Sequence, residues 1–309
     1  MPIPEFPATR PITLDDRAEI ATRLAAYGPD TSDLNFTNVY IWKPKYGFQV
    51  SRLGEALCIF ALRADAEDSF LLPPLGGDAD TVRECLALME RLGHDPKLAH
   101  ASQADLDRLA LPENEFEIVG DRDNSDYVYS VRDLIDLTGN LYHKKKNHIA
   151  QFMAKYQHEY RRITPDLVPA CLELQDRWCD EKHCDLVSSL MAEHRAIHDV
   201  LGNLEILDVT GGAILIDGRV EAFSIGEMLN ADTVVIHFEK ANGDFHGLYQ
   251  VINQQFLEHE WSEVPFVNRE QDLGIPGLRQ AKESYGPVRL VDKYVVRGRS
   301  QESEARSTN

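Results

Sequence analysis

The chain has 309 residues, of which 43% are hydrophobic and 27% are charged, values typical of a soluble globular protein long enough for two domains. Its 32 Lys and Arg against 51 Asp and Glu give a net charge of −19, which excludes a broad nucleic-acid or anionic-membrane surface unless basic groups are concentrated locally. Residues 1–5 lack a signal-peptide pattern, and no apolar run approaches the roughly 20 residues of a spanning helix. The five cysteines are an odd number and favour reduced thiols, so we expect a cytoplasmic protein.

The first half of the chain reads as helix, hairpin, strand, helix, helix and strands. Apolar periodicity and turn residues place these elements at 14–27 (helix), 48–50 and 56–62 (hairpin), 69–72 (strand), 82–92 and 103–109 (helices), and 116–119 and 127–131 (strands). The aromatic and β-branched residues 35–42 predict a strand, with a short helix as the alternative.

The middle segment 140–156 is the basic concentration of the chain. Four apolar side chains share one helical face there: Ile149, Phe152, Met153 and Tyr156. One turn earlier the same stripe passes through Lys145 and Lys146. A buried face that becomes cationic must open onto water or an anion, because an unpaired buried ammonium is too costly. These lysines are therefore candidate ligand contacts, and a solvated helix end is the alternative.

The second half repeats the order of elements found in the first. We expect them at 160–163 (strand), 166–182 and 186–201 (helices), 209–216 and 220–228 (hairpin around Asp217-Gly218), 233–241 (strand), a following helix, 265–268 (strand), 276–285 (helix) and 291–295 (strand). This is a repeat of architecture without detectable repetition of sequence.

Polar side chains gather where two of these strands end. The run from Thr233 stops at His237, Glu239, Lys240 and Asn242, and the short strand at 265–268 stops at Asn268, Arg269 and Glu270. A helix carrying Lys282 and Tyr285 follows and closes at Gly286-Pro287. Polar groups just past strand ends predict a ligand cleft in an α/β sheet.

Four segments in this order resemble one bacterial family, the uncharacterised group related to the C-terminal domain of phosphatidylglycerol lysyltransferase. They are Phe36–Trp42, Tyr142–Ile149, His237–Asn242 and Val267–Gly274, within a resemblance that runs from about Asp15 to Arg297. The order of elements is also that of the GNAT (Gcn5-related N-acetyltransferase) fold. The resemblance implies two tandem GNAT-like domains with mixed sheets flanked by helices. We expect them at 1–139 and 140–298, the second beginning with a helix at the seam (140–156), followed by a disordered tail at 299–309.

The resemblance implies an acyl or aminoacyl transferase that acts on a small or peptidyl amine. A non-catalytic GNAT-like ligand-binding or regulatory protein and an acetyl-CoA-dependent N-acetyltransferase are the alternatives. Aminoacyl-tRNA and acyl-CoA both stay open as donors, although the net charge disfavours tRNA. Coenzyme A usually binds a Gly-rich turn at a helix N-terminus, and the matching turn here contains Gly243 and Gly247 but also Asp244, an anion where a phosphate would lie.

Acyl transfer needs a group that takes the proton of the acceptor and a donor to the carbonyl oxygen. The candidates for proton transfer are Glu239, Glu270 and His237; His237 and Glu239 are two residues apart, so a regular strand would point both to one face. The resemblance implies that Tyr285 is a general acid. The expected ligand-binding residues are Lys145, Lys146, Lys240, Asn242, Asn268, Arg269 and Lys282. Strand-end ion pairs, Glu239 with Lys240 and Arg269 with Glu270, are the structural alternative.

Potential metal ligands cluster at Cys179, Glu181, His183 and Cys184. No second ligand pair follows at the spacing of a zinc finger, so we expect ordinary structural residues and no metal.

Overall fold

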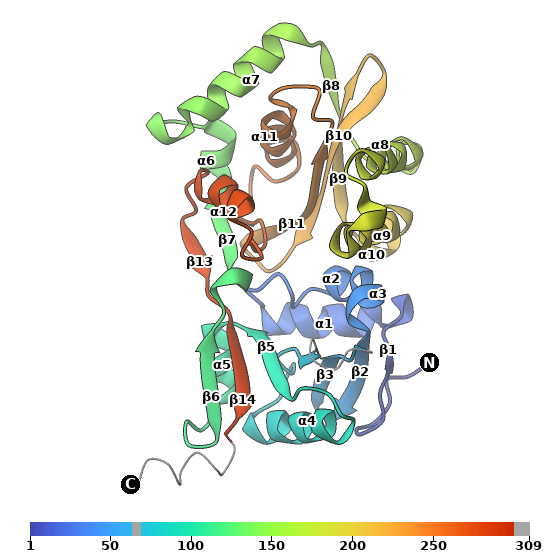
Figure 1. Ribbon diagram of the computed structural model, residues 1–309, viewed down its shortest axis with the longest axis vertical. Coiled ribbons are helices and arrows are strands. Elements are labelled where there is room, and N and C mark those ends of the chain that lie inside the picture. The colour runs from blue at the N-terminus through green and yellow to red at the C-terminus, as the bar shows by residue number, and fades with distance from the viewer. Residues whose placement is uncertain (64–68, 300–309) are drawn as a thin grey trace. The chain divides into compact units, whose positions relative to one another are not determined.

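The computed structural model describes residues 1–63 and 69–299. Two compact units divide the chain, one formed by Met1–Ser125 with the segment from Val291 onwards and the other by Asp126–Leu290 (Figure 1). This division differs from the expected boundary between residues 139 and 140. Apart from Arg299, the expected tail lies outside the described residues.

Unit 1 contains a mixed sheet and several helices. Its elements are β1 (Arg10–Pro11), η1 (Leu14–Asp16), α1 (Arg17–Tyr27), α2 (Phe36–Ile41), α3 (Lys43–Tyr46), β2 (Phe48–Leu53), β3 (Ala56–Ala61), β4 (Phe70–Leu71), α4 (Ala79–Arg91), β5 (Lys97–Ala101), α5 (Gln103–Leu109), β6 (Phe116–Gly120), η3 (Arg122–Asn124) and β14 (Tyr294–Gly298). In the described part of the chain, the strand order is β1-β2-β3-β4-β5-β14-β6. The parallel pairing of β4 with β5 makes this sheet mixed.

Unit 2 is built in the same way. Its elements are β7 (Asp126–Ser130), α6 (Val131–Asp136), η4 (Asn140–Tyr142), α7 (His143–Lys155), β8 (His158–Arg162), α8 (Val168–Glu181), η5 (Cys184–Leu186), α9 (Ser188–Gly202), α10 (Leu204–Leu207), β9 (Thr210–Ile216), β10 (Arg219–Met228), β11 (Thr233–Ala241), α11 (Leu248–Glu260), β12 (Phe266–Asn268), α12 (Pro276–Glu283) and β13 (Arg289–Val291). Over the described residues, the strand order is β13-β7-β12-β11-β10-β9-β8.

Helices cover both faces of the unit 2 sheet. Figure 1 shows α11 on one face and α8 with α9 on the other. The α11 residues Val251, Ile252 and Phe256 are buried against the sheet, as their spacing along the helix requires. The basic helix α7 packs on α11, with Phe152 fully buried. Mixed sheets flanked by helices were expected.

The two units exchange their last strands. We expected one strand at 291–295 that completes the second domain, but the chain forms β13 in unit 2 and β14 in unit 1, where β14 pairs with β5 and β6. In return β7 enters the unit 2 sheet beside β12. Lys293, which lies between β13 and β14, is buried and donates to Asp33 at 2.5 Å within unit 1. Strand order depends on contacts between residues far apart in sequence. The local hydrophobic pattern of a strand therefore does not predict which sheet the strand joins.

Residues 36–41 form a helix, the alternative to the strand that their composition favours. Asn35 caps this helix, because its side-chain oxygen accepts a hydrogen bond from the Asn38 amide at 3.1 Å. Five of the six helical residues are buried. The apolar side chains of this segment therefore pack in the core from a helix, as they would have done from a strand.

One pair of cysteines is bonded, which corrects the expectation of reduced thiols. Cys179 near the end of α8 is joined to Cys184 in η5, and both sulfurs are therefore committed to a disulfide. Cys58, Cys85 and Cys171 are free and buried.

Strands β11 and β12 run parallel and then separate, which opens the sheet. Their register pairs Thr233 with Phe266, Val234 with Val267 and Val235 with Asn268, after which β12 ends. On its other side, β11 has a β-bulge against β10 at His237, since Phe238 pairs with Ile225 and Ile236 with Gly226. Beyond Val235, β11 therefore has no paired residue of β12 beside it, and the residues that follow Asn268 leave the ladder.

Gly247 provides a test of how α7 and α11 pack. Its φ of 91° is unfavourable for other residues, and a Cβ there would lie 2.5 Å from the His148 carbonyl oxygen of α7. We expect Gly247→Ala to lower the free energy of unfolding by about 1–3 kcal/mol, measured by urea denaturation. Gly243→Ala, with nothing within 4 Å of its Cβ, is the matched control. Equal stability of the two variants would contradict this packing.

Candidate functional site

The centre of the candidate site is an ion pair at the point where β11 and β12 separate. Arg269, directly after β12, donates from Nη2 to Glu239 Oε1 at 3.2 Å, and the two side chains are 16% and 15% exposed. Asn253 of α11 donates to the other Glu239 oxygen at 3.0 Å. The buried Arg269 Nη1 has no hydrogen-bond partner among the described residues. A guanidinium group in this position thus keeps donor capacity for a ligand.

Tyr285 lies beside this guanidinium group. The Arg269 guanidinium carbon is 4.9 Å from the centre of the Tyr285 ring, and the Lys145 ammonium of α7 is 4.1 Å from it. Burial raises the pKa of Tyr285 to about 12, against the opposing effect of Arg269. The phenol therefore stays protonated at neutral pH and is a hydrogen-bond donor.

Two lysines add positive charge to the same site. Lys145 is buried and donates to the carbonyl and hydroxyl oxygens of Ser284 at 2.5 and 3.0 Å. Burial and the charge of Arg269 lower the pKa of Lys145. Lys282 of α12 donates to the carbonyl oxygens of Arg269 and Glu270, and burial together with Arg269 lowers its pKa to about 8. A partly neutral amine near pH 7–8 can accept a proton.

Buried polar contacts fix the segment that carries Arg269 and Glu270. The side-chain oxygen of Asn268 accepts a hydrogen bond from the Glu270 backbone amide at 2.8 Å, and its side-chain nitrogen donates to Asp126 at 2.9 Å. Asp272, fully buried, accepts from the Tyr127 hydroxyl at 2.6 Å and from Arg279 at 2.8 Å. The Arg279 hydrogen bond holds the pKa of Asp272 far below its usual range, despite burial. The charged segment is consequently held in one conformation.

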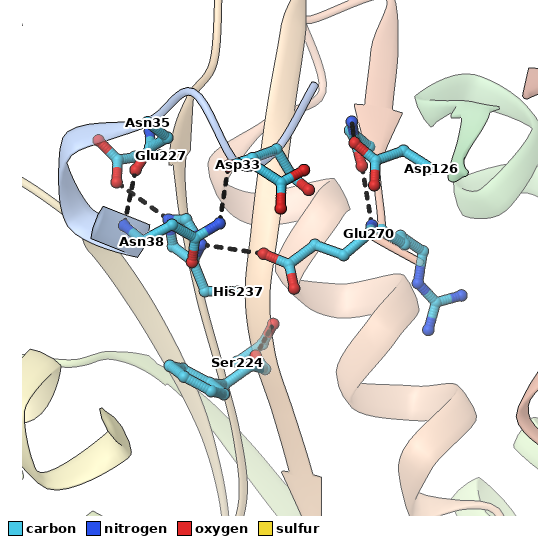
Figure 2. A network of polar contacts seen from close by, with 12 residues as sticks. Asp33, Asn35, Asn38, Asp126, Ser224, Glu227, His237 and Glu270 are labelled. Atoms are coloured by element: carbon cyan, nitrogen blue, oxygen red, sulfur yellow. Dashed lines mark hydrogen bonds and ion pairs between the residues drawn. The ribbon is translucent and has the colours of Figure 1, made fainter. Parts of the chain in front are cut away.

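His237 belongs to a second cluster next to the first. Figure 2 shows its ring between two carboxylates: Nε2 is 2.9 Å from Glu227 and Nδ1 is 3.3 Å from Glu270. Burial opposes protonation, but these hydrogen bonds outweigh it and raise the pKa of His237 to about 9. Its imidazole is therefore cationic at neutral pH. We expected it to share a face and a role with Glu239, yet the bulge at His237 interrupts the alternation and the two side chains have separate partners.

Three expected ligand contacts lie apart from this site. Lys240 is buried against the Trp178 ring at 3.6 Å and donates to Glu193 of α9 at 2.8 Å, on the α8–α9 side of the sheet. Asn242 donates to Glu221 at 2.9 Å. Lys146 is exposed. The sequence stripe did not distinguish Lys146 from the buried Lys145 because both flank the apolar face.

Three residues of the two clusters were not predicted: Tyr129, Asn253 and Glu227. Tyr129 donates to the Lys282 carbonyl at 2.9 Å and its ring lies 5.7 Å from Arg269. The strand pattern at 127–131 gave its location but not its proximity to β12, because β7 enters unit 2 from the first half of the chain. Asn253 is a polar residue on the buried face of α11, and that exception to the pattern was a usable signal.

The N-terminus of α11, where a Gly-rich turn would hold a pyrophosphate, is covered by α7. Gly247 caps α11 and lies against the His148 backbone, and the ring of Phe245 packs on Tyr156 at 5.0 Å. The backbone amide of Asp244 donates a hydrogen bond to the side-chain oxygen of Asn242 at 3.0 Å. These contacts hold Gly247 and Phe245 against α7 and Tyr156, whereas Gly243 and Asp244 in the turn are exposed.

Comparison with known proteins decides the family. Residues 24–297 match the family described as phosphatidylglycerol lysyltransferase, C-terminal. The chain belongs to this family. The family's name is that of an aminoacyl transferase, which agrees with the expected class of acyl and aminoacyl transferases.

Solved structures show the same fold over nearly the whole chain. A conserved protein of unknown function from Bacteroides thetaiotaomicron is 32% identical, with a TM-score of 0.85 over 93% of this chain and 98% of that one. The structure of L-PGS from Bacillus licheniformis is 12% identical, with a TM-score of 0.61 over 98% and 96%. The two mixed sheets flanked by helices fit the predicted tandem GNAT-like domains.

A curated relative matches a smaller part. An uncharacterized protein of Mycoplasmoides gallisepticum is 23% identical over 181 residues, and the match spans 56% of each chain. Within residues 1–63 and 69–299, no helix is long and apolar enough to cross a membrane.

The pKa of His237 predicts how stability depends on pH. Because folding raises this pKa from about 6.5 to about 9, the stabilisation is complete below pH 6.5 and is lost as the pH rises through 9. Glu227→Gln removes one of the two carboxylates and should flatten the decline in free energy of unfolding between pH 6.5 and 9, by about 1.4 kcal/mol for each pKa unit lost. Urea denaturation at the two pH values measures it.

Glu260→Gln is the control for this experiment. Glu260 accepts from Tyr160 and pairs with Arg162, whereas the carboxylates bonded to His237 are Glu227 and Glu270, so its substitution should leave the decline unchanged. Equal slopes for wild type and Glu227→Gln would show that His237 is neutral in the folded protein.

Proposed function

We propose that the protein transfers an aminoacyl group from an activated ester to a small or peptidyl amine, at the cluster around Arg269. The observation that supports this most strongly is the partly buried Arg269 between Glu239 and Tyr285, whose buried Nη1 has no hydrogen-bond partner among the described residues. The chain also belongs to a lysyltransferase-named family. A cation, a carboxylate and a phenol are the groups that acyl transfer requires at one point.

The attacking amine forms a C–N bond to the ester carbonyl carbon, and the carbonyl oxygen becomes an oxyanion. Arg269 Nη1 donates to that oxygen, in a partly buried site where a hydrogen bond to a developing charge is strong. The tetrahedral intermediate collapses with cleavage of the C–O bond to the leaving hydroxyl group. Tyr285, protonated at neutral pH, gives its proton to this oxygen.

The proton of the amine goes to a base in the same cluster. Glu239 is the first choice, because its carboxylate lies next to Arg269 and is oriented by Asn253. Lys282, with its pKa near 8, supplies a second proton acceptor. Glu270 is bonded to the cationic His237. We assign these two residues to holding the Arg269 segment in place, so His237 is not the base.

The donor is an aminoacyl ester and not an acyl-CoA in this proposal. The contacts of α7 with Gly247 and Phe245 cover the N-terminus of α11, where a coenzyme A pyrophosphate would accept amide hydrogen bonds. Positive charge is concentrated instead at Arg269, Lys145 and Lys282, which suits a terminal phosphate or ester carbonyl of a charged nucleotide end. An extended tRNA footprint is not required.

The proposal predicts a transfer activity that depends on this cluster. Purified protein is incubated with tRNA charged with mixed radiolabelled amino acids and with a panel of polyamines, amino-terminal peptides and phosphatidylglycerol vesicles. Label should pass to an amine. Tyr285→Phe removes only the hydroxyl group and should lower kcat by about 10²–10³-fold with little effect on KM, because the phenol acts on the leaving group.

Lys155→Ala is the matched control. It removes one charge from the exposed C-terminal end of α7, whereas Lys145→Ala removes one from the site on the same helix. Label that appears on phosphatidylglycerol would show that the acceptor is a lipid hydroxyl group and not an amine. Absence of transfer to every acceptor, or equal activity of Tyr285→Phe and wild type, would favour the non-catalytic binding protein.

Coenzyme A binding gives a separate prediction. Because the start of α11 is covered, titration calorimetry with acetyl-CoA should detect no binding below about 1 mM, the upper end of ordinary KM values. Binding in the micromolar range that Gly247→Ala abolishes would establish the acetyl-CoA-dependent alternative.

A further inference from the structure

A group of potential metal ligands lies on α8 and α9, away from the residues used above. Asp176 of α8 and His194 and His198 of α9 each offer one ligand atom, and these atoms all lie within 4.8 Å of one another. The histidines are four residues apart, so they share one face of α9. The carboxylate comes from the helix that packs on it.

The distances fit one small cation. Asp176 Oδ1 is 2.8 Å from His198 Nε2 and 3.8 Å from His194 Nε2. With metal–ligand bonds of 2.0–2.1 Å, the ligand atoms of a tetrahedral zinc site are separated by about 3.3 Å. The two observed separations lie on either side of this value, so small side-chain rotations are sufficient. The imidazole rings are already adjacent, with centroids 4.4 Å apart.

Ordinary hydrogen bonding does not account for His194. Asp176 accepts from His198, whereas the 3.8 Å separation from His194 Nε2 is too long for a hydrogen bond. The opposite nitrogen, His194 Nδ1, is buried with no hydrogen-bond partner in the described part of the chain. An ion held by all three side chains would account for the approach of the His194 Nε2 atom to a carboxylate that already accepts from His198.

We propose that Asp176, His194 and His198 form a binding site for a divalent late transition metal, with Zn²⁺ as the best fit. Two imidazoles and one carboxylate suit this class of ion, whereas Mg²⁺ and Ca²⁺ require more oxygen ligands. Asp176 is 54% exposed and His198 37%, so water completes the coordination. The ion would link α8 to α9, in addition to the Cys179–Cys184 disulfide at the turn between them.

The test is titration calorimetry of the untagged protein with Zn²⁺, together with the thermal midpoint at rising Zn²⁺. Wild type should bind one ion with micromolar affinity and its Tm should rise. His198→Ala and Asp176→Asn should each weaken binding at least about tenfold and remove the rise. Mg²⁺ should have no effect. Substitution with Co²⁺ should give the intense visible bands of tetrahedral coordination in wild type alone.

His246→Ala is the matched control. His246 and His148 form another pair of adjacent imidazoles, with centroids 4.6 Å apart, and the metal-ligand groups found among the described residues do not include them. This variant should bind Zn²⁺ like wild type. Binding that His246→Ala weakens and His198→Ala does not, or no binding at micromolar Zn²⁺ by folded wild type, would overturn the proposal. Circular dichroism confirms that each variant is folded.

Discussion

Burial of the Arg269 guanidinium group is the constraint on which the candidate site depends. A cation in such a position is stable only beside a counter-charge and within a polar network. Glu239 supplies the charge, and Asn253 orients it. Strands β11 and β12 stay paired for only three residues, so Glu239 and Arg269 both lie beyond the end of this pairing. Removing Glu239 would leave the Arg269 guanidinium group without its counter-charge. The ion pair therefore depends both on α11, which supplies Asn253, and on the end of the β11–β12 pairing.

A second buried cation supports the first. His237 between Glu227 and Glu270 fixes the residue that follows Arg269, and Asp272 holds the other end of the segment through Tyr127 and Arg279. Side chains that must meet a substrate within a fraction of an ångström need such support from their neighbours. In the proposed function, the His237 cluster is the support and the Arg269 cluster is the reactive centre.

The sequence predicted most elements, because their periodicity is local. An apolar stripe located α4, and Asp217-Gly218 located the β9–β10 turn. It did not predict which sheet receives the last strand, since β14 and β7 change units through contacts distant in sequence. The β-bulge at His237 could not be predicted from the two-residue alternation of side chains in a strand. For that reason, His237 and Glu239 were expected to act together. Four of the expected site residues do lie together: Arg269 is paired with Glu239, next to Tyr285, and its carbonyl oxygen accepts from Lys282. Their roles are part of the proposed function.

The most direct measurement is the affinity for a stable donor mimic, adenosine that carries an amide-linked lysyl or alanyl group at its 3′ position. Calorimetry compares this probe with adenosine, on wild type, Arg269→Lys and the control Lys155→Ala. If Arg269 receives the ester carbonyl, wild type and Lys155→Ala should bind the probe at least about tenfold more tightly than adenosine, and Arg269→Lys should lose that preference because Lys lacks the planar fork. Equal affinity for both compounds, or an unchanged preference in folded Arg269→Lys, would contradict the account.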